Sequence, residues 1–184
     1  NAGKRPDNEL SVSEIDVLIQ AFAKLGTTKV RLTGGEPSIR QDLPRIIELA
    51  KQTQGIQTVA VSSNGYRLAK HLSDWQTAGL NQLNISIDSF DPTIFKQITG
   101  FDILPTLLKD IDTLLATTDI KLKLNGILMA DTAFDNLQSV LSFVKNRPVT
   151  YRFIEFMQTS DNKALFFAQH SSCLLYTSDA ADEG

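Results

Sequence analysis

The feature that most constrains the fold of this 184-residue chain is the regular spacing of its predicted β-strands. Apolar and polar residues alternate in segments that begin at residues 28, 57, 82, 120 and 149. Amphipathic stretches with helical spacing fill the intervals between them. A strand, a helix and a further strand at this spacing form a βα repeat, whose crossovers place neighbouring strands parallel. The sequence therefore predicts an α/β fold built on a parallel sheet.

Helix signals separate the strands. A capping box of Ser11 and Glu14 opens the first helix, and Asp91 with Pro92 supplies an N-cap and a first-turn proline later in the chain. A complete eight-stranded barrel usually needs about 250 residues. The chain therefore supplies either part of a barrel with helices outside or an open doubly wound sheet, as one domain. The strands are predicted at residues 28–33, 57–62, 82–87, 120–128 and 149–155.

Composition is that of an ordinary globular protein and excludes several other classes. The chain is 42% hydrophobic and 21% charged and has one Cys, which excludes collagen-like, disulfide-rich and strongly disordered proteins. It has neither a long apolar run nor a signal-peptide pattern, so we expect a cytoplasmic protein without a membrane partner. The formal charge of −3 gives no indication of a nucleic-acid partner.

The two ends of the chain do not follow the repeat. The sequence opens on Asn1 rather than Met, so we expect an upstream segment to be missing. Residues 173–184 fit no periodic pattern and resemble translated sequencing-adapter DNA, a natural acidic tail being the alternative. Without them, acidic and basic side chains are equal in number and no Cys remains. We therefore predict a core at 1–159, an extension of unassigned structure at 160–172, and a non-native tail.

The predicted strands are apolar on one face and polar on the other, although parallel sheets covered by helices are usually apolar throughout. The apolar face must contact the helices, so a curled sheet would enclose the polar face as a lumen. Buried charges are costly unless they are paired, and an anion such as a nucleoside triphosphate would compensate them. A flat sheet with one solvated face would need no ligand. The cationic side chains on the polar face are Lys29, Arg31, Lys121, Lys123 and Arg152.

The first predicted strand ends in the sequence LTGGEP, at residues 32–37. Gly34 and Gly35 carry no Cβ, so their backbone N–H and C=O groups can approach a ligand closely. Active sites of α/β proteins lie at the carboxyl ends of the strands, where this turn stands. On its own the turn is more typical of a plain strand-to-helix connection. It is not a P-loop, because no Gly-Lys-Ser/Thr follows.

The longer segment KVRLTGGEP, at residues 29–37, resembles the GGEP segment of radical S-adenosylmethionine (SAM) enzymes. It is most similar to the MoaA-type GTP 3′,8-cyclases of molybdenum cofactor biosynthesis. The resemblance extends over residues 8–159 and implies the partial (β/α) TIM-type barrel of radical SAM enzymes, with parallel strands and outer helices. Four further motifs follow in family order: SSNGY at 62–66, NISIDS at 84–89, KLKLN at 121–125 and RFIEFM at 152–157.

The resemblance implies SAM as a cofactor and GTP as the substrate. Ser62 stands where the family usually has Thr, and it keeps the hydroxyl group. The positions that match SAM contacts of the family are Gly35, Ser86 and Met157. The positions that match GTP contacts, two of them near the phosphates, are Lys29, Arg31, Ser62, Lys123 and Arg152.

The resemblance also implies a reaction that this stretch of sequence cannot complete alone. In the family, a [4Fe-4S] cluster reduces SAM to a 5′-deoxyadenosyl radical, which abstracts hydrogen from the GTP ribose so that a cyclic pterin precursor forms. The cluster is held by Cys residues ahead of the first helix, and a second cluster by Cys residues beyond residue 159. We therefore expect no metal ligand or catalytic residue here, and an inactive fragment. The parent would carry both clusters, receive electrons from a donor and could form a homodimer.

Two alternatives stay open. One is another radical SAM enzyme, for example a peptide maturase, and the other is a cluster-free regulatory protein that binds a nucleotide or another anion. Cys motifs in the parent gene would separate them. We also expect Glu36 and Glu155 to pair with Arg or Lys side chains of the strands rather than to act as acid or base.

Overall fold

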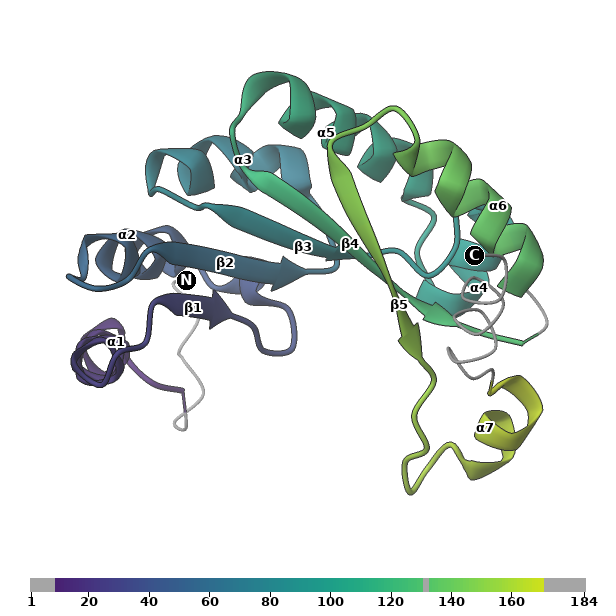
Figure 1. The fold of residues 1–184 in the computed structure, drawn as a ribbon, viewed down its shortest axis with the longest axis horizontal. Helices are drawn as coiled ribbons and strands as arrows, with labels where there is room; N and C mark the ends of the chain where they lie inside the picture. Colours follow the sequence, from purple (N-terminus) through teal and green to yellow (C-terminus); the bar gives the residue numbers. More distant parts are fainter. Residues whose placement is uncertain (1–8, 131–132, 171–184) are drawn as a thin grey trace, which may run out of the picture.

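The computed structural model describes residues 9–130 and 133–170, and its centre is one parallel five-stranded sheet (Figure 1). The strands lie in the order β1-β2-β3-β4-β5. Each βα unit thus adds its strand to the same growing edge, which is the order of a barrel and not of a doubly wound sheet. The strands are β1 (Lys29–Leu32), β2 (Thr58–Ser63), β3 (Gln82–Ser86), β4 (Lys121–Leu128) and β5 (Val149–Glu155).

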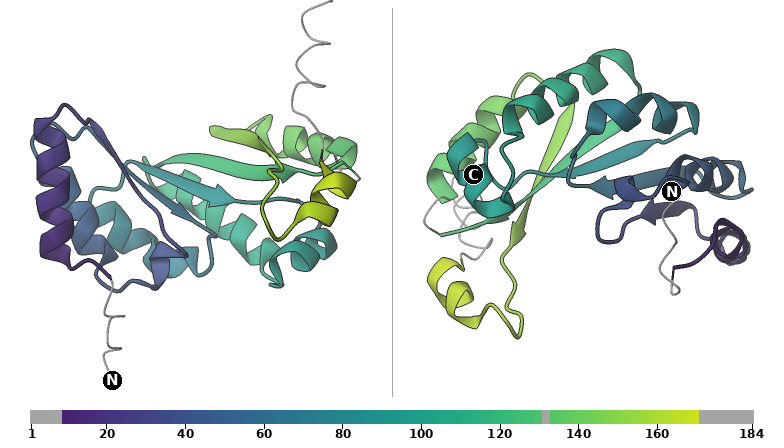
Figure 2. Two further views of the ribbon diagram at one scale, coloured as in Figure 1. Left: turned by 90° about the horizontal axis from the view of Figure 1, so that it is seen from below. Right: turned by 180° about the vertical axis from the view of Figure 1, so that it is seen from behind.

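Helices cover the convex side of the curved sheet. Figure 1 shows α2, α3, α5 and α6 following this outer side, and both views of Figure 2 place α1 and α7 at opposite ends of the molecule. The partial barrel with outer helices is therefore confirmed. The helices are α1 (Val12–Lys24), α2 (Leu43–Gln52), α3 (Leu68–Thr77), α4 (Pro92–Thr99), α5 (Leu104–Thr117), α6 (Ala133–Val144), α7 (Lys163–Gln169) and the short 3-10 helix η1 (Pro37–Ile39).

Local sequence signals set the helix ends as predicted. At the start of α1, Ser11 Oγ accepts a hydrogen bond from Glu14 N at 3.2 Å, and Glu14 Oε2 accepts one from Ser11 N at 2.7 Å. At the start of α4, one carboxylate oxygen of Asp91 accepts hydrogen bonds from the next two free backbone N–H groups of the helix. Both caps satisfy donors that have no partner inside the helix.

The apolar side chains of the strands pack against the helices and form the core. Alternation is clearest in β4, where every second residue, beginning with Leu122, is buried. Trp75 of α3 and Phe95 of α4, at 1% and 2% exposure, fill the space between the helices and the sheet. Each fully buried side chain of this size contributes about 1.5–3 kcal/mol to folding. The two faces of the sheet thus differ as the sequence predicted.

The extension at 160–172, to which no structure was assigned from sequence, contains the helix α7. Helix α7 ends against the carboxyl ends of β4 and β5. Ala130 N donates to the Gln169 carbonyl at 2.9 Å, and His170 Nε2 lies 2.7 Å from Glu155 Oε1. His170 is a partner of Glu155 that the sequence did not identify. The predicted non-native tail at 173–184 lies outside the described residues.

One side chain ties the last three strands together. Tyr151 of β5 reaches across β4 at Gly126, and its hydroxyl donates to the Ile87 carbonyl just after β3, at 2.6 Å. A Cβ at Gly126 would overlap the Tyr151 hydroxyl and lie 2.5 Å from that carbonyl oxygen. Burial raises the pKa of Tyr151, so the phenol remains a donor at neutral pH. Position 126 therefore requires glycine, because any side chain there would clash with Tyr151 and Ile87.

Replacing this glycine tests the tie. We expect Gly126→Ala to lower the free energy of unfolding by about 2–4 kcal/mol, because it adds a clash and displaces the Tyr151 hydrogen bond. Urea denaturation monitored by circular dichroism measures the loss. Gly34→Ala is the matched control, since a Cβ there meets no atom within 4 Å, and it should change stability by less than about 1 kcal/mol. Equal losses in the two variants would contradict this account of Tyr151.

Candidate functional site

The inner face of the sheet brings together side chains from distant parts of the sequence. Ser62 of β2 pairs with Asn84 of β3, which pairs with Lys123 of β4. One level nearer the carboxyl ends, Ser86 pairs with Asn125 and Asn125 with Arg152 of β5. Side chains at paired positions of neighbouring strands stand on the same face. The predicted GTP positions Ser62, Lys123 and Arg152 therefore share one surface.

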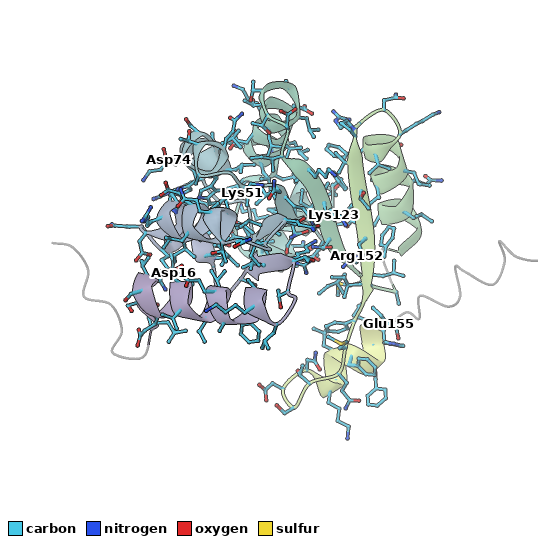
Figure 3. All side chains as sticks on the ribbon, turned by 60° about the vertical axis from the view of Figure 1, so that its left-hand side comes forward. Asp16, Lys51, Asp74, Lys123, Arg152 and Glu155 are labelled. Carbon is cyan, nitrogen blue, oxygen red and sulfur yellow. The ribbon has the colours of Figure 1, made fainter. Side chains whose placement is uncertain are left out.

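Four cations converge on this inner face, and we call Lys29, Arg31, Lys123 and Arg152 the cation cluster. The pKa of Lys29 is lowered, first by loss of hydration and then by repulsion from Arg31, Lys123 and Arg152. Lys29 lies on β1 and Arg152 on β5, at opposite edges of the sheet, so its curvature brings the edges within electrostatic reach. Figure 3 labels Lys123 on β4 and Arg152 on β5, two strands that pair in the sheet.

The cation cluster has no carboxylate counterpart in the described part of the chain. The ion pairs formed by residues 9–130 and 133–170 involve other basic residues and none of these four. Lys121 lies on the same face but is not among the charges that lower the pKa of Lys29. The arrangement favours a polyvalent anion, whose binding would remove the mutual repulsion.

Two buried amides that sequence reasoning missed lie beside the cluster. Gln82 and Asn84 of β3 are 5% and 3% exposed. Gln82 Oε1 accepts from Lys29 Nζ at 3.0 Å, and Gln82 Nε2 donates to Asn84 Oδ1 at 2.8 Å. Asn84 Nδ2 then donates to Ser62 Oγ at 3.3 Å. The available signal was that both residues occupy inward positions of β3 and alternate with the apolar residues Leu83 and Ile85.

The loop after β1 is fixed to the end of β2 by Glu36. Its Oε1 accepts from Ser63 Oγ at 2.8 Å and its Oε2 from Asn64 N at 2.7 Å. The predicted pairing of Glu36 with Arg or Lys is therefore wrong. The turn carries the carboxylate over the backbone of the neighbouring strand end, away from the inner-face cations, and there it also caps η1 through Ser38 N at 3.0 Å.

The predicted SAM positions lie along the carboxyl edge of the sheet on three different strands. Gly35 follows β1, Ser86 ends β3, and Met157 follows β5 with 71% of its surface exposed. A Cβ at Gly35 would meet no protein atom within 4 Å, so space remains open beside this backbone. An exposed thioether and an open glycine backbone fit a small ligand such as SAM.

The described residues do not fit an iron–sulfur cluster. Such clusters are held by Cys thiolates, and the one Cys of the chain, Cys173, lies outside residues 9–130 and 133–170. Within these ranges no three His, Cys, Asp or Glu side chains are grouped so as to hold a metal ion.

The helices among the described residues are too short or too polar to cross a bilayer.

Curated GTP 3′,8-cyclases are similar to this chain in sequence. The cyclase of Vibrio cholerae serotype O1 is 46% identical over 168 residues, which are 91% of this chain and 50% of the relative. That of Vibrio vulnificus is 44% identical over 171 residues, which are 93% of this chain and 51% of the relative. The chain thus spans about half the length of the curated relatives it matches.

Solved structures and a family model agree on the fold. Streptococcus suis SuiB bound to S-adenosylmethionine has a TM-score of 0.71 at 11% identity, over 92% of this chain and 38% of SuiB. Native anSMEcpe with bound AdoMet has a TM-score of 0.64 at 9% identity, over 87% of this chain and 48% of that one. Residues 1–130 match the model of the radical SAM superfamily. The chain belongs to the radical SAM superfamily.

Proposed function

We propose that the protein containing this chain is a GTP 3′,8-cyclase, a radical SAM lyase that makes the cyclic pterin precursor of the molybdenum cofactor. The observation that carries the proposal is the cation cluster, which faces the inside of the sheet and has no carboxylate partner among residues 9–130 and 133–170. The names of the similar curated proteins point to the same activity. We place the protein in the cytoplasm, where it would receive electrons from a separate donor and could form a homodimer.

In this proposal the inner face binds GTP. Arg31 and Lys123, from β1 and β4, would contact the triphosphate from two sides, while Lys29 and Arg152 supply further charge near the phosphates. A guanidinium group matches two phosphate oxygens at once, and an ammonium group acts as a point charge. The hydroxyl of Ser62 would add a directional hydrogen bond. Binding of the triphosphate would offset the repulsion within the cation cluster.

The carboxyl edge would hold SAM. The backbone of Gly35, the hydroxyl of Ser86 and the side chain of Met157 would contact it, and Glu36 would keep the glycine loop in place through Ser63 and Asn64. SAM supplies the radical chemistry of the superfamily. The contribution of this chain is to orient two ligands next to each other and to neutralise the charge of one of them.

An anaerobic assay of the full-length protein tests the proposed function. With reductant, SAM and GTP, we expect release of 5′-deoxyadenosine that depends on GTP, together with a cyclised product of GTP. Release that does not depend on GTP would indicate another radical SAM enzyme, such as a peptide maturase. Binding of GTP without any release, by a protein that takes up no iron on anaerobic reconstitution, would indicate a cluster-free regulatory protein. Either result would overturn the proposal.

Removing one cation should weaken the binding of GTP. We expect Lys123→Ala to raise the Kd for GTP of the full-length protein by about 10- to 100-fold, as for the loss of a charge-assisted hydrogen bond. Isothermal titration calorimetry measures it. Lys121→Ala is the control, because Lys121 lies two residues earlier on the same face and outside the cation cluster. The assignment fails if both variants weaken binding equally.

The lowered pKa of Lys29 predicts a pH dependence. An anion favours the charged ammonium form, so its binding raises the pKa of Lys29. The affinity for the anion therefore falls as the pH rises through the pKa that Lys29 has in the free protein. Titrations with inorganic triphosphate between about pH 8 and pH 10.5 should show this loss. Lys29→Arg, whose side chain stays charged, should show less of it. Identical pH profiles for the two proteins would rule out Lys29 as the titrating group.

A further inference from the structure

The buried amides of β3 form a hydrogen-bond chain whose direction is fixed at both ends. The Lys29 ammonium can only donate, so Gln82 must turn Oε1 toward it, at 3.0 Å. Gln82 Nε2 therefore faces Asn84 Oδ1, at 2.8 Å. At the other end the Val61 carbonyl can only accept, so Asn84 must present Nδ2, at 3.2 Å. Neither amide can be rotated without breaking one of these bonds.

The fixed direction determines what Ser62 can do. Asn84 Nδ2 lies 3.3 Å from Ser62 Oγ and donates to it, so Ser62 accepts in this bond. A hydroxyl group has one hydrogen to donate. The hydrogen of Ser62 is used in no other hydrogen bond among the described residues. It is therefore available to a ligand that lies on the inner face of the sheet.

We propose that Gln82 and Asn84 are positioning residues for Ser62. Because Lys29 can only donate, the amides of Gln82 and Asn84 are oriented so that Ser62 accepts from Asn84 and can donate its own hydrogen to the ligand. This inference rests on the proposed function, in which the inner face binds GTP. The polar atoms of both amides are already engaged, at Lys29, Val61 and Ser62, so they act through their neighbours.

The consequence is a preference for ligand atoms that accept hydrogen bonds. Between Arg31 and Lys123, which can only donate, a Ser62 hydroxyl that also donates suits a phosphate or carbonyl oxygen. A ligand N–H at this position could bond only to the second lone pair of the Ser62 oxygen, and the Ser62 hydrogen would then be left without a partner. A buried donor without a partner costs about 1–3 kcal/mol. The hydrogen bonds from Lys29 to Ser62 thus add a preference for acceptor atoms of the ligand, which charge alone does not provide.

Reversing the direction of the hydrogen bonds between Gln82, Asn84 and Ser62 tests the proposal in the full-length protein. In Gln82→Glu the new carboxylate can only accept, and the charge-assisted bond to it favours turning Asn84 Nδ2 toward position 82 and Oδ1 toward Ser62, at the expense of the bond to the Val61 carbonyl. The hydroxyl of Ser62 then donates to Asn84 and is lost to the ligand. We expect the Kd for GTP, measured by calorimetry, to rise at least about tenfold. Thermal unfolding of each variant shows whether it has kept its fold.

The control must separate the direction of hydrogen bonds from the added negative charge. Lys121→Gln changes the charge by the same amount at the position that pairs with Gln82 in the sheet. It should raise the Kd for GTP by no more than about threefold, as expected for a charge outside the cation cluster. Equal effects of Gln82→Glu and Lys121→Gln would overturn the inference.

A double-mutant cycle identifies Ser62 as the group through which Gln82 acts. If Ser62→Ala already removes the donor, Gln82→Glu should add no more than the charge effect in that background. Additive losses would overturn the inference, because they would show that Gln82 acts independently. If Gln82→Glu does not fold, Asn84→Asp takes its place in the same cycle, since its carboxylate also accepts the Ser62 hydrogen. If the wild-type protein does not bind GTP, it is the proposed function that fails.

Discussion

Curvature of the parallel sheet is the constraint on which the rest of the molecule depends. Because helices cover only the outer face, the inner face can carry charge, and because the sheet curls, charges on its two edges act on one another. The pKa of Lys29 on β1 responds to Arg152 on β5, although three strands lie between them. On a flat sheet the same side chains would lie farther apart, and solvent would screen their mutual repulsion more strongly. Curvature thus brings charges from different strands close enough to repel one another.

The two faces of the sheet obey different physical rules. On the outer face apolar side chains exclude water, and the space between them limits which residues fit, as at Gly126 beside Tyr151. On the inner face donor and acceptor directions decide, as the amides of Gln82 and Asn84 demonstrate. Strand β3 takes part in both and is almost entirely buried. Its polar residues are therefore held more firmly than those of the edge strands.

The sequence was sufficient for the features that depend on local pattern. Strands appeared within one residue of the predicted ends, and the inward positions of Lys29, Arg31, Lys123 and Arg152 followed from alternation. Features that depend on loop direction and on contacts between strands did not follow. The Glu36 carboxylate is turned toward Ser63 and Asn64 by a loop whose path no periodicity encodes. Gln82 and Asn84 gain their roles only through the register of β2, β3 and β4.

The order of the strands also bears on how the chain folds. Each strand pairs with the one that precedes it, so every interface of the sheet joins segments that are close in sequence, and such folds can grow unit by unit from the amino end during synthesis. The electrostatic links from β1 to β4 and β5 are different, because they exist only once those strands have been added. Repulsion within the cation cluster therefore opposes the addition of β4 and β5 and not that of β2 and β3. An anion present at that stage would favour the addition of these strands around itself, so ligand binding and the growth of the sheet would be coupled.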